Sequence, residues 1–455
     1  MAAASVNKAY PQLHMANILI FAREILPYCN SVGSSLRVAT LARHLADAGH
    51  SVTLLGAKGN FVSNFGLDGL LKGVNTIYID DYLQNYYTKK IKRNLHAAEY
   101  PSVNVRRTNV GRNIELIKSF VIKNIIKGIK YLSVPDIAII FLPKFIFYAL
   151  KIIRQKNINT LIVSSPPHSS QVLILFAKVF GLKRLELIVD YRDGWNTFDL
   201  FRPKYQLGAV LSKCIERKVL LTCDQFLYQS SRVLLDITDQ LKLKDIIESK
   251  STLVRNGYTE SGDLTILAEQ DKKFNSPIFK IGYFGGIDFD PGSWRNPSRF
   301  LDKLDAIGKS FELVIHGPPV NLAHAPKYNN ISIIHKGMLD LPLAKNAMVS
   351  FDALFVFHSS GSGSEEVIPG KFYEYIQACR PILVCGPPLM ECGLLVEECN
   401  FGVFIRSTST NNDVRKLIER LQDETKAKEF IFSLKSRSFE FSRRYQYSKI
   451  RLKNS

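Results

Sequence analysis

The sequence predicts an α/β protein built from two doubly wound, Rossmann-like domains that face each other across a cleft. Its 455 residues are enough for two or three domains of ordinary size. Short apolar runs, typical of buried parallel strands, alternate with helical segments in both halves of the chain. A polar stretch at 259–277 lies between the two series and is the expected interdomain linker.

The first domain is expected over residues 15–258. Its opening strand at 16–21 is followed by a polar loop and a helix at 36–49, which Gly49 can end because glycine readily adopts the left-handed conformation after a helix. The remaining strands are expected at 50–57, 159–165, 185–193, 224–230 and 252–258, and the remaining helices at 169–180 and 205–221. This alternation predicts a parallel sheet covered by helices.

The second domain is expected over residues 278–435, followed by a basic helix or tail at 436–455. Its strands are expected at 278–286, 311–317, 330–337, 352–357 and 380–386. Ligands of such sheets bind at the carboxyl ends of the strands, so the loops that follow the strands of both domains are expected to face the cleft.

The composition excludes a mainly disordered or fibrous protein, because 46% of the residues are hydrophobic and 11% are aromatic. The formal net charge of +19 indicates an anionic partner, which could be nucleic acid, a phosphorylated ligand or a membrane surface. The sequence contains no zinc-finger, RNP or helix-turn-helix motif, so nucleic acid is not expected as a partner.

Most of the positive charge lies in a basic insert at 87–156, where few acidic residues oppose a long series of Lys and Arg residues. Within it, residues 114–132 have the periodicity of an amphipathic helix. The polar side of this helix carries Lys123, Lys127 and Lys130. Two interpretations stay open: an interfacial helix on an anionic membrane, or an ordinary surface helix with solvated lysines.

The seven cysteines include no C-x-x-C pair, which argues against both a disulfide framework and a zinc site. We therefore expect no metal and a reducing, cytoplasmic compartment. No signal peptide is evident, and the most apolar stretch, at 137–150, is interrupted by Pro143 and Lys144. Peripheral attachment to the cytosolic face of a membrane is an alternative that the sequence leaves open.

The strongest motif is a Gly/Ser-rich loop that runs into a helix, at residues 359–384. Lys371 lies at the expected helix start, where exposed N–H groups and the helix dipole favour an anion, and its charge suits phosphate oxygens. Glu374 follows about one turn later and can accept two hydroxyl hydrogen bonds, as from a ribose diol. Lys371 and Glu374 could also be a solvated pair on an ordinary helix.

The segment GKFYEYIQACRPIL at 370–383 resembles the GK-x-x-EY-x-x-x-x-RPI stretch of bacterial family 4 glycosyltransferases, which have the GT-B fold. Glu366 and Glu374 are spaced like the E-x7-E pair of GT-B enzymes. Other segments are similar to the family in the same order along the chain: the opening at 17–55, LIVSSPPHSS, ELIVDYRDGW, STLVRNGY and FKIGYFGGI.

The resemblance implies a retaining transferase that uses a nucleotide-diphospho-sugar as co-substrate, with no other cofactor and no structural metal. The nucleotide would lie on the second domain and the acceptor on the first. Glu374 would bind the ribose, and Glu366, or its neighbour Glu365, would contact the donor sugar. The other expected donor contacts are Lys371, Gly370, Gly285 and Gly286 at the diphosphate, Lys336, Gly337 and Met338 at the base, and Gly33 and Ser34 in the opening loop.

The sequence departs from the family in one loop after the expected strand at 278–286, where many members carry an Arg and a Lys. Only Arg295 could substitute for them here. His168 and Asp193 follow strand ends and are candidates for catalytic or acceptor contacts, although His168 could be a structural histidine and Asp193 a helix cap. Because the basic insert lies in the acceptor half, we expect a saccharide or lipid-linked acceptor in surface polysaccharide biosynthesis.

Two other functions stay open at this point. One is a nucleotide-sugar 2-epimerase of the same fold. The other is a non-catalytic nucleotide-binding or membrane-scaffold protein.

Overall fold

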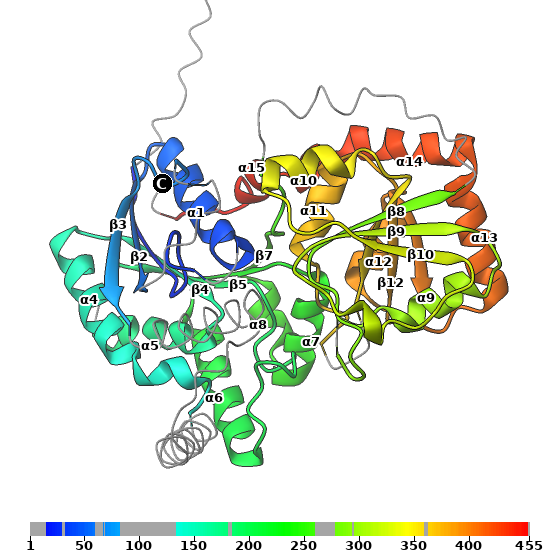
Figure 1. Ribbon diagram of the computed structural model, residues 1–455. Coiled ribbons are helices and arrows are strands. Elements are labelled where there is room, and N and C mark those ends of the chain that lie inside the picture. Colours follow the sequence, from blue (N-terminus) through cyan, green and yellow to red (C-terminus); the bar gives the residue numbers. More distant parts are fainter. Residues whose placement is uncertain are drawn as a thin grey trace, which may run out of the picture.

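The computed structural model describes residues 15–29, 32–59, 67, 69–81, 133–180, 184–259, 278–293, 295–358 and 363–453. The described chain forms two α/β domains side by side, each with a central sheet between layers of helices (Figure 1). The predicted helix at 114–132, with Lys123, Lys127 and Lys130, lies outside the described residues.

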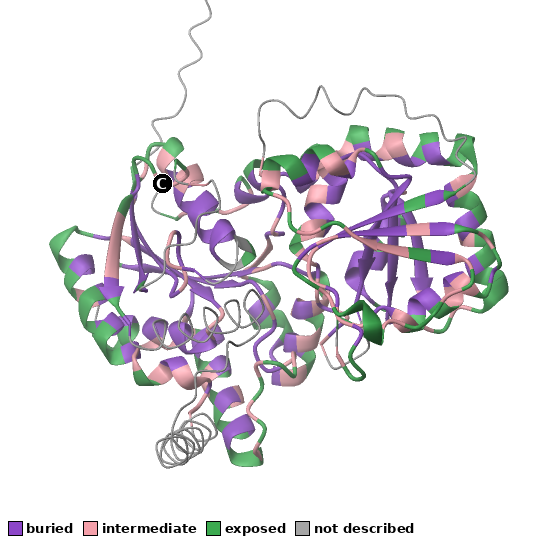
Figure 2. Cartoon of the chain, in the orientation of Figure 1, coloured by how far each residue is buried: buried purple, intermediate pink, exposed green. Residues whose placement is uncertain are grey.

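The first sheet has seven parallel strands in the order β3-β2-β1-β4-β5-β6-β7. The strands are β1 (Asn17–Phe21), β2 (Ser51–Lys58), β3 (Asn75–Asp80), β4 (Thr160–Ser165), β5 (Glu186–Tyr191), β6 (Gln225–Tyr228) and β7 (Ser251–Leu253). β4 and β5 are fully buried, as expected for central parallel strands, and Figure 2 shows this buried interior.

Helices cover both faces of this sheet. The helical segments are α1 (Val32–Asp47), η1 (Ile137–Ile140), α4 (Leu142–Gln155), η2 (His168–Gln171), α5 (Val172–Val179), α6 (Gln206–Thr222), α7 (Ser231–Leu241) and α8 (Lys244–Glu248). Residues of α4, α5, α6 and α7 share one hydrophobic core, whereas α1 contributes to a core on the other face.

The second sheet has six parallel strands in the order β10-β9-β8-β11-β12-β13. The strands are β8 (Phe279–Phe284), β9 (Phe311–His316), β10 (Ile331–His335), β11 (Ala353–Phe357), β12 (Ile382–Gly386) and β13 (Gly402–Arg406). The helical segments are α9 (Ser298–Asp305), η4 (Leu322–His324), α10 (Leu341–Met348), α11 (Gly370–Gln377), α12 (Glu391–Glu398), α13 (Asn411–Gln422), α14 (Glu424–Arg437), η5 (Ser438–Phe441) and α15 (Arg443–Tyr447).

The end of the chain returns from the second domain to the first. Helix α15 lies beside α1 (Figure 1), where the Tyr447 hydroxyl donates to the carbonyl of Arg37 at 2.9 Å. Further along, Lys453 Nζ lies 3.1 Å from a carboxylate oxygen of Asp224. The tail at 436–455 therefore joins the two domains, a role that its basic composition did not indicate.

Several elements differ from the sequence-based expectation. Strands β3 and β13 were not predicted, and α1 begins at Val32, so that Gly33 and Ser34 lie in its first turn and not in a preceding loop. The apolar stretch at 137–150 forms η1 and most of α4, whose inner side packs on the sheet. No helix in the described part of the chain is long and apolar enough to cross a membrane.

Candidate functional site

The strand order of each sheet reverses at one place, and the candidate residues gather at these places. The reversal lies between β1 and β4 in the first sheet and between β8 and β11 in the second. Adjacent loops leave such a pair of strands in opposite directions and open a crevice at their carboxyl ends. His168 follows β4, and Gly285 and Gly286 follow β8, so both sets of residues lie at the carboxyl ends of these strands, although His168 is almost completely buried.

The turn after β8 requires glycine. Gly285 has φ +136°, a conformation that favours glycine, and its N–H donates to the carbonyl of His316 at 2.8 Å. A Cβ on Gly317, which follows β9, would lie 2.0 Å from the carbonyl oxygen of Gly285. The backbones of the two strand ends are thus in direct contact.

Two cationic side chains converge on this turn. A Cβ on Gly285 would lie 2.9 Å from Lys371 Nζ, and a Cβ on Gly286 would lie 2.9 Å from Arg295 Nη1. The Lys371 ammonium also lies 3.5 Å from the centre of the Tyr283 ring. The structure therefore brings Lys371 and Arg295 together at Gly285 and Gly286.

Burial and the nearby Arg295 charge lower the pKa of Lys371 well below its usual value. Among the residues that the structure describes, no carboxylate forms an ion pair with Lys371. A bound anion would favour the charged form of the lysine and compensate the two neighbouring positive charges. The turn after β8 thus has the electrostatic character of a phosphate site.

Glu366 reaches across to the first domain. Its side chain is almost fully buried, and its carboxylate lies against Gly194, in the loop after β5, where a Cβ would be 2.1 Å from Glu366 Oε2. Burial, with a contribution from the nearby Asp236 charge, raises the pKa of Glu366 to about 8. Burial therefore favours the protonated carboxyl, which can donate a hydrogen bond as well as accept one.

The structure distinguishes Glu366 from its neighbour Glu365. Glu365 Oε2 lies 3.6 Å from Arg232 Nη2, at a polar cavity of about 580 Å³ between the domains. Glu366 alone of the two is buried against the loop that contains Gly194. Glu366 therefore faces the first domain, whereas Glu365 faces the cavity; which of them contacts a donor sugar stays a prediction.

His168, which follows β4, packs against the loop after β5 that contains Asp193. The His168 ring is stacked on Trp195 at 5.3 Å, and burial together with the Arg192 charge lowers the pKa of His168 to about 3, so the imidazole is neutral. Burial raises the pKa of Asp193, which Arg192 opposes. Trp195 Nε1 donates to Ser212 Oγ at 3.0 Å, which fixes the loop to α6.

Glu374 has a partner that the sequence could not indicate. Its Oε2 lies 3.2 Å from Lys345 Nζ of α10, and both side chains are largely buried. Gly370, in contrast, is exposed at the first position of α11. The Glu374 carboxylate is thus positioned by an ion pair with Lys345.

The predicted base-binding residues surround the end of β10. Gly337 has φ +78°, and its carbonyl accepts a hydrogen bond from the N–H of Gly317 at 3.1 Å. Lys336 donates its N–H to the carbonyl of Ile315, and Met338 is 72% exposed.

Gly33 is exposed in the first turn of α1, where a Cβ would meet nothing within 4 Å. Ser34 is the next residue of that turn.

A buried ion pair between the domains was missed by sequence reasoning. Arg255 Nη1, just after β7, lies 2.6 Å from Glu391 Oε1 at the start of α12. The same carboxylate accepts hydrogen bonds from the N–H groups of Ser231 and Arg232 and from the Ser230 hydroxyl. Glu391 of the second domain therefore caps helix α7 of the first, and no local pattern signals such a contact.

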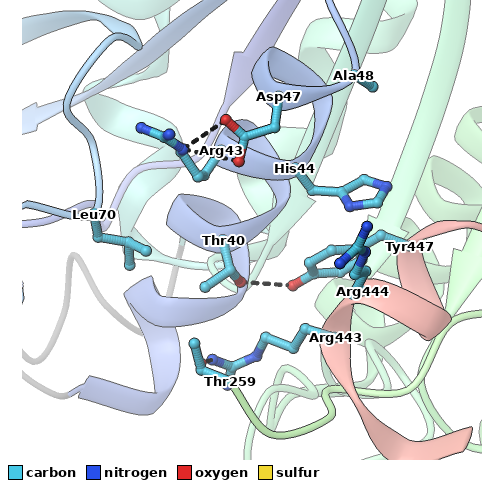
Figure 3. A pocket seen from close by; sticks show the side chains of 10 residues that line it. All are labelled: Thr40, Arg43, His44, Asp47, Ala48, Leu70, Thr259, Arg443, Arg444 and Tyr447. Carbon is cyan, nitrogen blue, oxygen red and sulfur yellow. Dashed lines mark hydrogen bonds and ion pairs between the residues drawn. The ribbon is translucent and has the colours of Figure 1, made fainter. Parts of the chain in front are cut away.

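A second cavity, of about 470 Å³, lies between α1 and α15 (Figure 3). Several of its charged side chains have partners within the protein: Arg43 pairs with Asp47 at 2.8 Å, and Arg443 donates to the carbonyl of Asn256. None of the predicted site residues lines it. Among the described residues, no group of three or more His, Cys, Asp or Glu side chains could hold a metal ion.

No model of a protein family matches this sequence, and no curated protein matches it either. The structure resembles the sucrose-phosphate synthase tll1590 from Thermosynechococcus elongatus, at 12% identity and a TM-score of 0.59 over 95% of this chain and 96% of that one. It also resembles Anabaena Alr3699/HepE in complex with UDP, at 11% identity and a TM-score of 0.54 over 95% and 97% of the two chains.

A third similar structure is the apo form of the lipopolysaccharide outer core galactosyltransferase WaaB, at 10% identity and a TM-score of 0.53 over 95% and 97% of the chains. Likeness at such identity establishes the fold. The chain has the GT-B fold of these glycosyltransferases, and the predicted fold class is confirmed. Membership of bacterial family 4 stays a prediction.

Proposed function

We propose that this protein is a retaining glycosyltransferase that moves a sugar from a nucleotide-diphospho-sugar to an acceptor. The observation that carries the proposal is the convergence of Lys371 and Arg295 on the glycine turn after β8. This turn lies at the strand-order reversal of the second sheet, the place where a doubly wound domain binds its ligand.

The charges at this turn suit the chemistry of sugar transfer. Breaking the bond between the sugar and the diphosphate leaves negative charge on the departing oxygen. Lys371, Arg295 and the N–H groups at the start of α11 would stabilise that charge without moving far. Loss of one such donor typically raises the barrier by ~3–4 kcal/mol. We propose that these groups serve the diphosphate without a metal ion or other cofactor.

Two carboxyl groups would position the donor. Glu374 would accept a ribose hydroxyl through Oε1, because Oε2 is held by Lys345. Glu366 would bind a hydroxyl of the donor sugar, and its protonated form would act as a hydrogen-bond donor. The base would lie near Lys336, Gly337 and Met338 at the end of β10.

The acceptor would bind on the first domain, near His168 and Asp193. His168 and Trp195 are almost completely buried, so they would support the loop beneath the acceptor and would not contact it. We propose a saccharide or lipid-linked acceptor in surface polysaccharide biosynthesis, with the enzyme on the cytoplasmic side. If the acceptor hydroxyl attacks the same face of the sugar that the nucleoside diphosphate leaves, the anomeric configuration is retained. No protein nucleophile is then needed.

The first test is thermal denaturation with UDP, GDP, ADP and dTDP, because a ligand that binds only the folded state raises its stability by RT ln(1+[L]/Kd). The nucleotide with the preferred base should raise the denaturation temperature more than the others. The matching nucleotide-sugar should then be turned over by the wild type and not by Glu374→Ala, with folding checked by circular dichroism. Conversion of the donor to its epimer without acceptor would indicate the epimerase, and binding without any product would indicate the scaffold. Failure of every nucleotide to bind would refute the donor site.

A further inference from the structure

Three adjacent helices on one face of the first sheet, α4, α5 and α6, expose large apolar side chains. Phe147 on α4 is 64% exposed, Val179 on α5 is 80% exposed and Leu207 on α6 is 66% exposed. Phe180, Val210 and Leu211 are also exposed. Single exposed apolar residues are ordinary, but several on adjacent helices form a patch, and such patches mark interaction surfaces.

The outer sides of these helices form one continuous layer. α5 packs against both α4 and α6, while the opposite sides of all three helices are buried in the core under the sheet. Figure 2 shows exposed stretches along the outer sides of these helices. We call this layer the α4–α6 face, defined by the exposed side chains of Leu142–Gln155, Val172–Val179 and Gln206–Thr222 together with Phe180.

The charges of the α4–α6 face are all positive. Every charged side chain of the three helices is Lys or Arg, with the exception of Glu216, which is fully buried and accepts a hydrogen bond from Asn196. The exposed cations include Lys151, Arg154, Lys178, Arg217 and Lys218. Within the described part of the chain, none of these five forms an ion pair.

The surface helix α14 of the second domain differs from this pattern. On α14, Lys426 lies 2.8 Å from Glu429 and Lys428 lies 2.7 Å from Glu424, so positive side chains there are balanced by acidic neighbours. The α4–α6 face has the cations without the acids. Its charge is therefore complementary to a negative partner, whereas the charge of α14 is largely balanced.

We infer that the α4–α6 face binds the surface of a membrane that contains anionic lipids. Phe147, Val179 and Leu207 would enter the boundary between headgroups and acyl chains, and the lysines and arginines around them would meet lipid phosphates. The aliphatic side chains of the patch favour a membrane over nucleic acid as the partner. Nucleic-acid bases stack on aromatic rings and arginine, and contact with valine or leucine contributes little binding free energy. The inference rests on the surface and not on the proposed activity.

The experiment measures co-flotation of the full chain with vesicles of phosphatidylcholine alone or mixed with phosphatidylglycerol. The triple variant Phe147→Ser, Val179→Ser, Leu207→Ser removes one exposed apolar side chain from each helix. The control variant Leu235→Ser, Leu343→Ser, Phe432→Ser removes side chains of similar exposure elsewhere. We expect the wild type and the control to bind the mixed vesicles alike, and the partition coefficient of the test variant to fall at least about tenfold.

A second variant separates charge from apolar insertion. The triple variant Lys151→Gln, Lys178→Gln, Arg217→Gln should bind the mixed vesicles more weakly than the wild type. Its remaining binding should also depend less on salt concentration, because about 0.5 M salt screens exposed charges. The inference is overturned if the wild type does not bind mixed vesicles, or if both triple variants bind like the control. It is also overturned if the α4–α6 variants instead abolish self-association or RNA binding while vesicle binding persists. Thermal denaturation of every variant checks folding.

Discussion

The carboxylate of Glu366 in the second domain occupies the space that a side chain at Gly194 in the first domain would need, since a Cβ there would lie 2.1 Å from Glu366 Oε2. Nearby, a Cβ on Gly363 would lie 2.7 Å from Cα of Phe198, so the two loops touch at more than one point. Glycine at these positions allows a loop after β5 and a loop before α11 to close on each other. The contact places Glu366 at the first domain and away from solvent.

Gly194→Ala should displace Glu366, because a real Cβ is essentially never found so close to another atom. We expect turnover of the nucleotide-sugar to fall at least about tenfold, as misplaced groups in active sites commonly cause. Affinity for the free nucleotide should change little, since Lys371 lies elsewhere. Gly69→Ala is the control, because a Cβ there would meet nothing within 4 Å. Unchanged turnover in Gly194→Ala would contradict the role of Glu366.

Stability should depend on pH through Glu366. Burial raises its pKa from 4.5 to about 8, so between these values the folded chain holds a proton that the unfolded chain has lost. The contribution of Glu366 to stability is therefore full below about pH 4.5 and is lost as the pH rises through about 8. Glu366→Gln should remove this loss, which thermal denaturation of both proteins across pH 5–9 can measure. Parallel curves would show that the carboxyl is not protonated when folded.

Lys371→Met should weaken the binding of a nucleoside diphosphate selectively. One hydrogen bond to a charged group contributes about 1.5–3 kcal/mol, which corresponds to a roughly ten- to hundredfold change in Kd. Affinity for the nucleoside without phosphates should stay the same, and calorimetry with both ligands measures the difference. Lys309→Met, at a lysine that lies 3.7 Å from Glu419, is the control. Equal losses for both ligands would place Lys371 outside the diphosphate site.

Glu391→Gln should loosen the contact between the domains. Arg255 would remain buried without its charged partner, and such a loss typically costs about 3–5 kcal/mol. Urea denaturation should show a lower midpoint or a separate transition for each domain. The double variant Arg255→Met, Glu391→Met should recover part of the loss, because it leaves no unpaired buried charge. A single variant as stable as the wild type would refute the interdomain role.

The same ion pair should lose its effect in acid. Burial alone would raise the pKa of Glu391, but the Arg255 charge and the N–H groups of Ser231 and Arg232 lower it overall. A lowered pKa means that this stabilising contribution is present above the ordinary glutamate value and is lost as the pH falls through the lowered value. The difference in stability between wild type and Glu391→Gln should therefore shrink on acidification, as denaturation at pH 7 and pH 3 can measure.

The alternation of strands and helices was predictable because hydrophobic periodicity is a local property. Strands β1, β4 and β8 lie close to their predicted positions, and the glycine turn after β8 was found from the sequence alone. Strand β3 was missed because its residues are mostly half-buried at the edge of the sheet, and β13 was missed at the opposite edge of the second sheet. β3 carries a weak apolar pattern, whereas β13 is almost fully buried and was missed although most of its residues are apolar.

By itself the sequence determined the two-domain α/β architecture and the segment in which Lys371 and Glu374 lie, because motif spacing and periodicity act over a few residues. Only the tertiary structure decided which of Glu365 and Glu366 faces the first domain, that Lys345 holds Glu374, and that Glu391 caps α7. Each of these contacts joins elements far apart in the chain. Their geometry depends on how the two sheets and their helices pack, and packing between distant segments leaves no local signal in the sequence.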